Sequence, residues 1–164
     1  MKKLLCVLLI CVITSAGLIE ASACGDKTMR VGGIRFNKIL LRDHHANILI
    51  YSPAIPKGKA PQLTEYLQKN GQKTKYVEDA GSFRAGAVSG QYDLILTDLA
   101  DAGTLKSVVE ASSPRTMVVP VVLKPSKADK AAAKRYKVVV TDPESGEDFL
   151  IAVWRVYREK SRSA

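Results

Sequence analysis

The sequence predicts an α/β domain built on a five-stranded parallel sheet. Short apolar runs recur between residues 47 and 141, and segments with helical spacing of apolar residues lie between them. Short apolar runs are typical of strands that are buried on both faces, as in parallel sheets. Strands that alternate with helices favour right-handed crossover connections, and therefore one parallel sheet in a single domain.

The run Leu94–Thr97 is expected to be a central strand, because it is apolar, short and flanked by polar residues. It ends at Asp98. A carboxylate at the carboxyl end of a parallel strand lies where open α/β sheets place their ligand crevices. Asp98 is therefore the first candidate site residue.

The other elements follow from periodicity, capping residues and breakers. Ser82 is a candidate N-cap, Ser126 with Asp129 has the spacing of a capping box, and Ser145 with Asp148 repeats it. Pro120 argues for limited pairing within its strand. The expected strands are 47–52, 74–78, 94–97, 117–123 and 137–141, and the expected helices are 61–70, 80–90, 102–112, 126–135 and 145–160. Leu105, Val108 and Val109 are expected to face inward.

Residues 1–23 are expected to be a secretory signal peptide. A basic start precedes an apolar run of 16 residues and a small-residue cleavage site of the Ala-x-Ala kind. An uncleaved membrane anchor is the alternative, although the run is shorter than the ~20 residues that a span needs. The chain would then be exported, and either periplasmic or anchored to a membrane.

Cys24 is expected to be the one thiol of the mature chain. The small residues before it resemble the lipobox of bacterial lipoproteins, with Ala21 where leucine is usual, so Cys24 is a candidate for lipidation. A free thiol or an intermolecular disulfide are the alternatives.

Residues 24–46 are expected to form an N-terminal extension, with an exposed lead-in over 24–33 and a short amphipathic helix over 34–42. The pair His44-His45 invites a metal hypothesis. Adjacent side chains point in different directions, and no further zinc ligands occur at suitable spacing, so we expect no metal site.

The chain carries a formal net charge of +9. This charge favours anionic partners such as lipid headgroups, or serves only the solubility of a basic exported protein. No aromatic-basic motif for nucleic acid is present. The hydrolase motif Gly-x-Ser-x-Gly and a Gly-rich phosphate-binding motif are also absent. We therefore expect neither an enzyme nor a cofactor.

Residues 47–160 resemble the receiver domain of two-component response regulators. The specific part is the segment Tyr92–Leu99, with Ile48-Leu49-Ile50 and Pro120–Leu123 as supporting strands. The resemblance implies a flavodoxin-like fold with strand order 2-1-3-4-5. It also implies that Asp98 stands at the position of the phosphoacceptor.

The chain departs from the receiver pattern at every other site position. Tyr51-Ser52-Pro53 stands where receivers carry paired acids, Lys124 replaces a hydroxyl residue, and Asp142 replaces a lysine. Mg²⁺ is bound by several oxygen ligands, and Asp98 alone supplies too few of them. We therefore regard Asp98 as a degenerate phosphoacceptor position and expect no Mg²⁺-dependent phosphorylation. The pocket expected at this edge comprises Ser52, Thr97, Asp98, Lys124, Thr141 and Asp142. Either Lys124 pairs with Asp98 and Asp142 in an ion cluster, or these side chains are solvated.

These observations favour an exported, non-catalytic interaction module that docks a protein partner or a membrane surface. The alternative is a binding protein for a small anionic ligand, held in the crevice at the carboxyl ends of the first and third strands. Its ligand would be held by Ser52, Lys57, Lys59 and Thr104.

Overall fold

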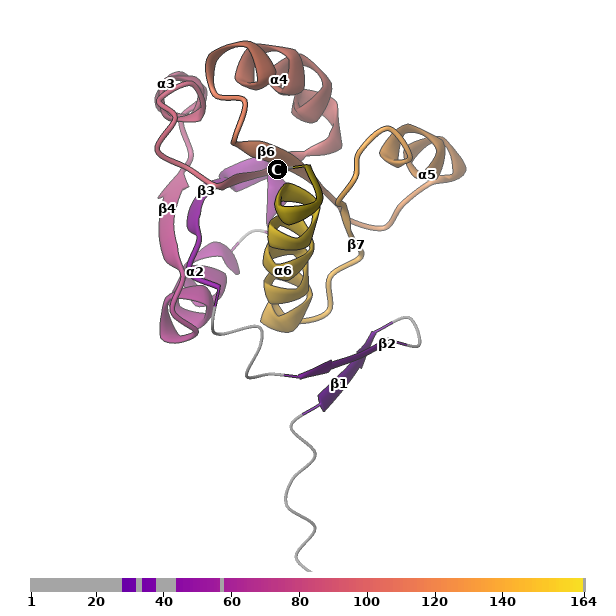
Figure 1. Ribbon diagram of the computed structural model, residues 1–164. Coiled ribbons are helices and arrows are strands. Elements are labelled where there is room, and N and C mark those ends of the chain that lie inside the picture. The colour runs from indigo at the N-terminus through magenta and orange to yellow at the C-terminus, as the bar shows by residue number, and fades with distance from the viewer. Residues whose placement is uncertain (1–27, 32–33, 38–43, 57, 164) are drawn as a thin grey trace, which may run out of the picture.

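The structure is a computed structural model that describes residues 28–31, 34–37, 44–56 and 58–163 (Figure 1). The expected signal peptide and Cys24 lie outside the described residues. In the part of the chain that is described, no helix combines the length and the apolar character needed to cross a membrane.

Two sheets are present, and the larger one is the expected parallel sheet. Its five strands are ordered β4-β3-β5-β6-β7, which is 2-1-3-4-5 in the order of the domain, and all neighbours are parallel. The predicted fold is thus confirmed. The strands are β1 Thr28–Val31, β2 Ile34–Asn37, β3 Asn47–Tyr51, β4 Lys73–Val77, β5 Leu94–Asp98, β6 Met117–Val122 and β7 Val140–Thr141. The helices are η1 Ser52–Ala54, α2 Ala60–Lys69, α3 Ala80–Ala87, α4 Leu99–Ser112, α5 Lys127–Ala133 and α6 Gly146–Ser163.

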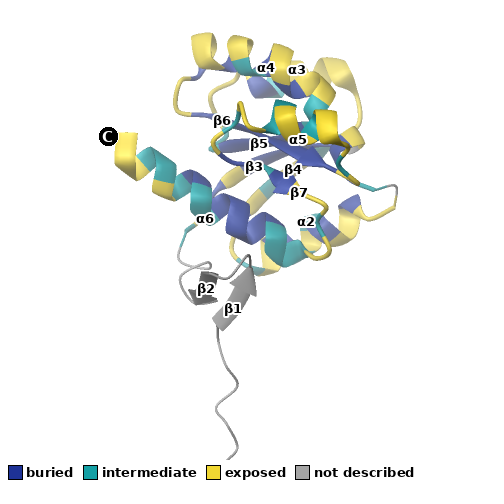
Figure 2. Cartoon of the chain, turned by 90° about the vertical axis from the view of Figure 1, so that its right-hand side faces the viewer, coloured by how far each residue is buried: buried dark blue, intermediate teal, exposed yellow. Residues whose placement is uncertain are grey.

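The central strands of the large sheet, β3, β5 and β6, are buried on both faces. Along β5, Leu94 and Leu96 belong to an apolar cluster shared with α2 and α6, whereas Ile95 belongs to a second cluster shared with α3 and α4. Side chains alternate between faces along a strand, so each central strand feeds both clusters. Figure 2 shows the buried strands between helices whose outer surfaces are exposed.

The edge strand β7 is short, and it pairs only with the end of β6, at Val121 and Val122. Within β6, the Met117 N–H donates to the carbonyl of Asp93 on the β5 side, whereas the Val122 carbonyl accepts from Asp142 on the β7 side. Backbone polar groups alternate between the two sides of a strand, so Pro120 faces away from β5. Its missing N–H therefore costs no bond to β5, where Pro120 is paired opposite Thr97, and pairing is limited only on the β7 side, where the ladder starts at Val121.

The helix starts follow their capping residues, with one correction. Ser126 and Asp129 form the expected capping box of α5. For α3, Ser82 is not the cap, because the carboxylate of Asp79 accepts a hydrogen bond of 2.6 Å from the Ser82 N–H. The first turn of a helix leaves its N–H groups without intrahelical partners, and an aspartate side chain one turn earlier satisfies one of them.

The expected helix over 34–42 is wrong at its start. Residues 34–37 form β2, which pairs antiparallel with β1 from Thr28 opposite Asn37 to Val31 opposite Ile34. Apolar and polar residues alternate over 34–37, and Gly32-Gly33 in the sequence separates the two strands, which is typical of a two-residue hairpin. Residues 34–37 therefore form a strand, as their alternation of apolar and polar residues predicts, and not the start of a helix.

The inward face of α4 also differs from the expectation. Leu105 and Val109 are buried, but Val108 is 46% exposed. Positions 105 and 109 are four residues apart and share one face, whereas position 108 lies beside that face.

Candidate functional site

The carboxyl edge of the sheet is organised around Asp98, the last residue of β5. Asp98 is the N-cap of α4, and its Oδ1 accepts a hydrogen bond of 2.8 Å from the Asp101 N–H. The residue has extended backbone angles (φ −69°, ψ 166°), as N-caps do. The sequence places this carboxylate directly between a buried strand and a helix, so its first role is to start the helix.

Thr97 is fully buried beside Asp98. Its side chain is 0% exposed, and no partner is found for its Oγ1. A buried hydroxyl without a hydrogen bond lowers the free energy of unfolding by about 1–3 kcal/mol, so Oγ1 of Thr97 destabilises this edge of the sheet.

Apolar residues close the ends of β5 and β6. The short helix η1 contacts both strands, and Ala54 and Ile55 at its end are buried at 1% and 6% exposure. At the end of β3, Tyr51 stacks on Phe83 with ring centroids 4.2 Å apart. The last residue of β3 thus takes part in an aromatic stack, and aliphatic side chains are buried at the end of η1.

Lys124 and Asp142 follow the ends of β6 and β7. Both adopt the left-handed backbone region, with φ of 50° and 46°, and both are exposed. The Asp142 N–H donates to the Val122 carbonyl at 2.7 Å, which extends the β6–β7 pairing by one bond. Left-handed residues reverse the chain direction sharply, so both residues turn the chain away from the sheet.

The ion cluster of Asp98, Lys124 and Asp142 is not formed as a set of direct ion pairs. None of the ion pairs of 4.0 Å or less among the described residues includes any of the three. Thr141 ends β7 and is exposed. Ser52 begins η1, and its side chain lies outside the described residues.

The residues of the alternative anion crevice are spread over separate elements. Lys59 precedes α2 as its N-cap and makes no side-chain capping bond. Thr104 lies on the exposed side of α4, and Lys57 is outside the described residues.

His44 and His45 have packing and hydrogen-bonding roles. The ring of His44 stacks on Tyr157 at 4.9 Å, and Nδ1 of His45 lies 2.8 Å from the carbonyl of Gly71. Across the described ranges, no group of three His, Cys, Asp or Glu residues is arranged to hold a metal ion.

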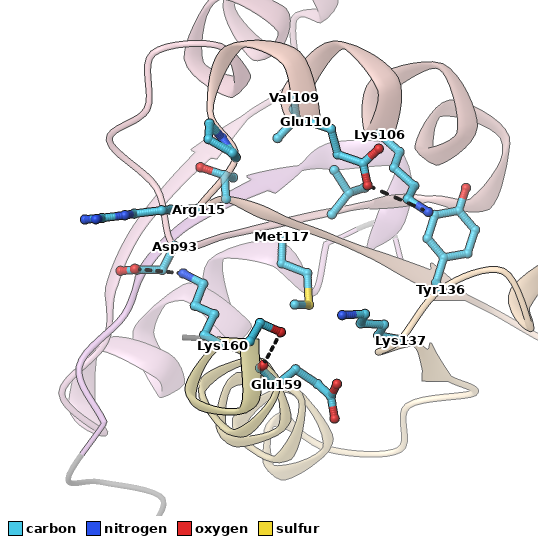
Figure 3. Close-up of a pocket in the computed structure, with 14 residues that line it drawn as sticks. Asp93, Lys106, Val109, Glu110, Arg115, Met117, Tyr136, Lys137, Glu159 and Lys160 are labelled. Atoms are coloured by element: carbon cyan, nitrogen blue, oxygen red, sulfur yellow. Dashed lines mark hydrogen bonds and ion pairs between the residues drawn. The ribbon is translucent and has the colours of Figure 1, made fainter.

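A groove of about 770 Å³ lies at the opposite, amino-terminal edge of the sheet (Figure 3). We call it the amino-edge groove. It runs across the uncovered start of β6, between α4 on one face and the end of α6 on the other. Val109, Met117 and Val118 supply its apolar floor, and Tyr136 and Lys137 supply one wall. Its size is in the usual range for ligand pockets.

Three carboxylates line the amino-edge groove, and each has a cation close by. Lys160 Nζ lies 3.1 Å from Asp93 Oδ1, Lys106 Nζ lies 3.8 Å from Glu110 Oε1, and Arg162 lies 3.3 Å from Glu159. The other Asp93 oxygen accepts from the Asn47 N–H at 3.0 Å, so Asp93 joins the start of β3 to the end of α6.

Two cations of the amino-edge groove have no such partner. Arg115 and Lys137 are exposed, and neither takes part in an ion pair of 4.0 Å or less among the described residues. They lie on opposite sides of Met117 (Figure 3). Lys106 also lies 5.6 Å from the centroid of the Tyr136 ring, and burial raises the pKa of the Tyr136 hydroxyl.

Sequence reasoning missed the amino-edge groove because it followed the carboxyl ends of the strands. A signal was present: Arg115 precedes β6 and Lys137 precedes β7 in the sequence. The amino ends of neighbouring parallel strands meet at one edge, so two basic residues at these positions are expected at the same edge of the sheet.

Comparisons with known proteins agree with this architecture. No family model matches the chain, and no curated protein matches it. Among solved structures, a response regulator protein from Burkholderia pseudomallei is similar, with 16% identity and a TM-score of 0.53 over 72% of each chain. The regulatory domain of the repressor of iron transport regulator, in its inactive form, has 20% identity and a TM-score of 0.54, over 70% of this chain and 96% of that one. At these identities the likeness concerns the fold, and the chain has the fold of a response regulator receiver domain.

Proposed function

We propose that this chain is an exported, receiver-like binding module that docks a partner without phosphotransfer. The observation that carries the proposal is the position of Asp98, whose carboxylate caps α4 while apolar residues cover the strand ends around it. The Burkholderia structure contains a phosphorylated aspartic acid and a calcium ion. Here β3 ends at Tyr51 and η1, Ser52–Ala54, follows it, so neither the last residue of β3 nor η1 supplies a second carboxylate to help Asp98 hold a cation.

Fixed contacts at this edge support a static role. Asp98 holds the first turn of α4, and Asp142 and Lys124 turn the chain away from the sheet with left-handed backbones. A switch needs two arrangements of similar free energy, biased by a local change of charge. A carboxylate already used as a cap, at the end of a strand that η1 contacts, offers little for a phosphoryl group to change.

The test is incubation of the mature chain with acetyl phosphate and Mg²⁺, followed by intact mass spectrometry. We expect no phosphoryl adduct, and a stable adduct on Asp98 would overturn the proposal. Asp98→Asn and Asp98→Ala serve as a matched pair for the capping role. Asparagine caps helices about as well as aspartate, whereas alanine should lower the free energy of unfolding by about 1 kcal/mol.

Export is the second half of the proposal, and residues 1–23 support it through their signal-peptide pattern. Expression in a secreting bacterium, with mass analysis of the product, should find Cys24 as the first residue. A full-length chain retained in the cytoplasm would contradict export.

A further inference from the structure

The amino-edge groove contains an incomplete strand edge. Val118 lines the groove, and its backbone groups face away from β5, because they share the orientation of Val122, whose carbonyl bonds to Asp142. Within the described residues, β7 pairs with β6 only at Val121 and Val122. The N–H and carbonyl of Val118 therefore have no ladder partner on this side.

A buried backbone N–H normally has a partner. More than nine in ten buried backbone polar groups in native structures are paired, whereas the backbone groups of Val118, a groove residue, have no ladder partner on the β7 side. An open strand edge is also a template on which an extended segment of another chain adds as a further strand. Pro120 removes a donor from this edge, so such an added strand would be short.

The charges around the edge select the kind of segment. The groove carboxylates Asp93, Glu110 and Glu159 are each neutralised by a nearby cation, whereas Arg115 and Lys137 are not. The uncompensated charge of the groove is therefore positive, on both sides of the apolar Met117. An acidic segment with apolar residues complements it.

The chain itself is a poor source of this segment. Residues 1–27 and 38–43, which the structure does not describe, carry five basic and three acidic residues. Their net charge has the same sign as the groove. A second copy of the chain, at +9, is likewise repelled at long range.

We propose that the amino-edge groove takes a short, extended, acidic segment of a partner protein as an added strand at Val118, held between Arg115 and Lys137. This inference rests on the proposed docking function and names its surface and its partner's chemistry. The stretch from Met117 to Pro120 is three steps long, or roughly 10 Å at about 3.3 Å per residue, so about four partner residues would pair or lie alongside.

The probe is a fluorescein-labelled peptide, Thr-Val-Glu-Val-Glu-Val-Thr, with blocked ends, and its binding to the mature chain is measured by fluorescence anisotropy. We expect saturable binding that weakens at high salt. The double variant Arg115→Glu with Lys137→Glu should weaken it at least about tenfold. The matched control Lys75→Glu with Lys134→Glu makes the same change of charge at exposed positions outside the groove and should leave binding within about twofold. Circular dichroism checks that all variants are folded.

Amide hydrogen exchange distinguishes strand pairing from electrostatic attraction alone, because attraction alone would not slow exchange of the Val118 N–H. The Val118 N–H should exchange more slowly when the peptide is bound, because it then donates to the added strand. Unchanged exchange at Val118 with bound peptide would overturn the strand-addition geometry. Equal loss of binding in the control variant would overturn the assignment to the groove.

Three further probes test other possible ligands of the groove: a basic peptide, a small anionic molecule and a membrane surface. The same peptide with lysine for glutamate should not bind. Octanoate that binds while the acidic peptide does not would show a small-molecule site and overturn the proposal. Phosphatidylglycerol vesicles that bind equally to the groove and control variants, without peptide binding, would favour a membrane surface and overturn it. Absence of peptide binding with no phosphoryl adduct refutes this inference alone, whereas an adduct on Asp98 refutes the proposed function.

Discussion

At the scale of single residues, Gly146 shows how tightly the start of α6 packs on α2. A Cβ at position 146 would lie 2.7 Å from both Cγ and Cε1 of Tyr66, closer than carbon atoms approach in folded proteins. Because Cγ lies next to the α2 backbone, the ring can give way only by changing its rotamer or by displacing α2. The sequence gives no warning of this contact, because a glycine at the start of a helix is also compatible with an ordinary turn.

We predict that Gly146→Ala lowers the free energy of unfolding by about 1–3 kcal/mol, the usual cost of overpacking. Gly103→Ala is the matched control. It lies inside α4, where an added Cβ would be 3.8 Å from the Tyr136 hydroxyl, an ordinary contact. Alanine should be neutral or stabilising there by up to about 1 kcal/mol, because it is the better helix former. Urea unfolding measures both, and equal effects of the two variants would refute the packing argument.

At the scale of elements, carboxylates serve the starts of three helices: Asp79 and Asp98 cap α3 and α4, and Asp129 completes the capping box of α5. Hydrogen bonds from Ser82 hold the pKa of the Asp79 carboxyl below its ordinary value of 3.8, and bonds from Ser126 do the same for Asp129. A lowered pKa means that the folded state favours the charged carboxylate. Its contribution to stability is fully present above the ordinary value and is lost as the pH falls through the lowered pKa.

We therefore predict that α3 and α5 lose stability on acidification through these two caps. Thermal unfolding from pH 6 to pH 2 should show a smaller loss of Tm for the double variant Asp79→Asn with Asp129→Asn than for the unchanged chain, since asparagine caps without titrating. Asp101→Asn is the control, because the Asp101 side chain makes no capping bond. Parallel curves for all three proteins would contradict the role of the caps.

Elements were also the level at which the sequence was most informative. Each strand and α-helix of residues 47–163 was expected to within about three residues at each end, because apolar periodicity and capping residues agree along this part of the chain, whereas the short helix η1 was not expected. One wrong prediction lies before this part of the chain. Residues 34–37 satisfy a period of two as well as part of a helical period, and the Gly-Gly pair before them decides for the hairpin.

At the scale of the molecule, the candidate site was less predictable than the fold. The strand order places Asp98, Lys124 and Asp142 at one edge, but it does not say whether their side chains meet. Left-handed backbones at Lys124 and Asp142 and the capping bond of Asp98 are local geometries that the residue types alone do not specify. The amino-edge groove exists because β7 is only two residues long, Val140–Thr141. The strand expected from the sequence, 137–141, was longer than the strand in the structure.

The sheet divides the core into two clusters, and this division has a measurable consequence. Val156 of α6 is fully buried in the cluster on one face, and Val109 of α4 is fully buried in the cluster on the other. Each valine to alanine substitution should cost about 1–3 kcal/mol, from two lost methyl groups and a residual cavity.

We predict that the double variant Val109→Ala with Val156→Ala loses the sum of the two single effects, within about 0.5 kcal/mol, because the close-packed strands keep the two cavities apart. Val156→Ala with Val153→Ala is the contrasting pair, since both residues belong to one cluster and can relax into a shared cavity. Its effects should depart from additivity by more than the cross-sheet pair does. Urea unfolding of the single and double variants measures both cycles. A larger coupling energy across the sheet than within one cluster would mean that β3, β5 and β6 transmit packing changes from face to face, and that the sheet does not act as a rigid partition between the carboxyl edge and the amino-edge groove.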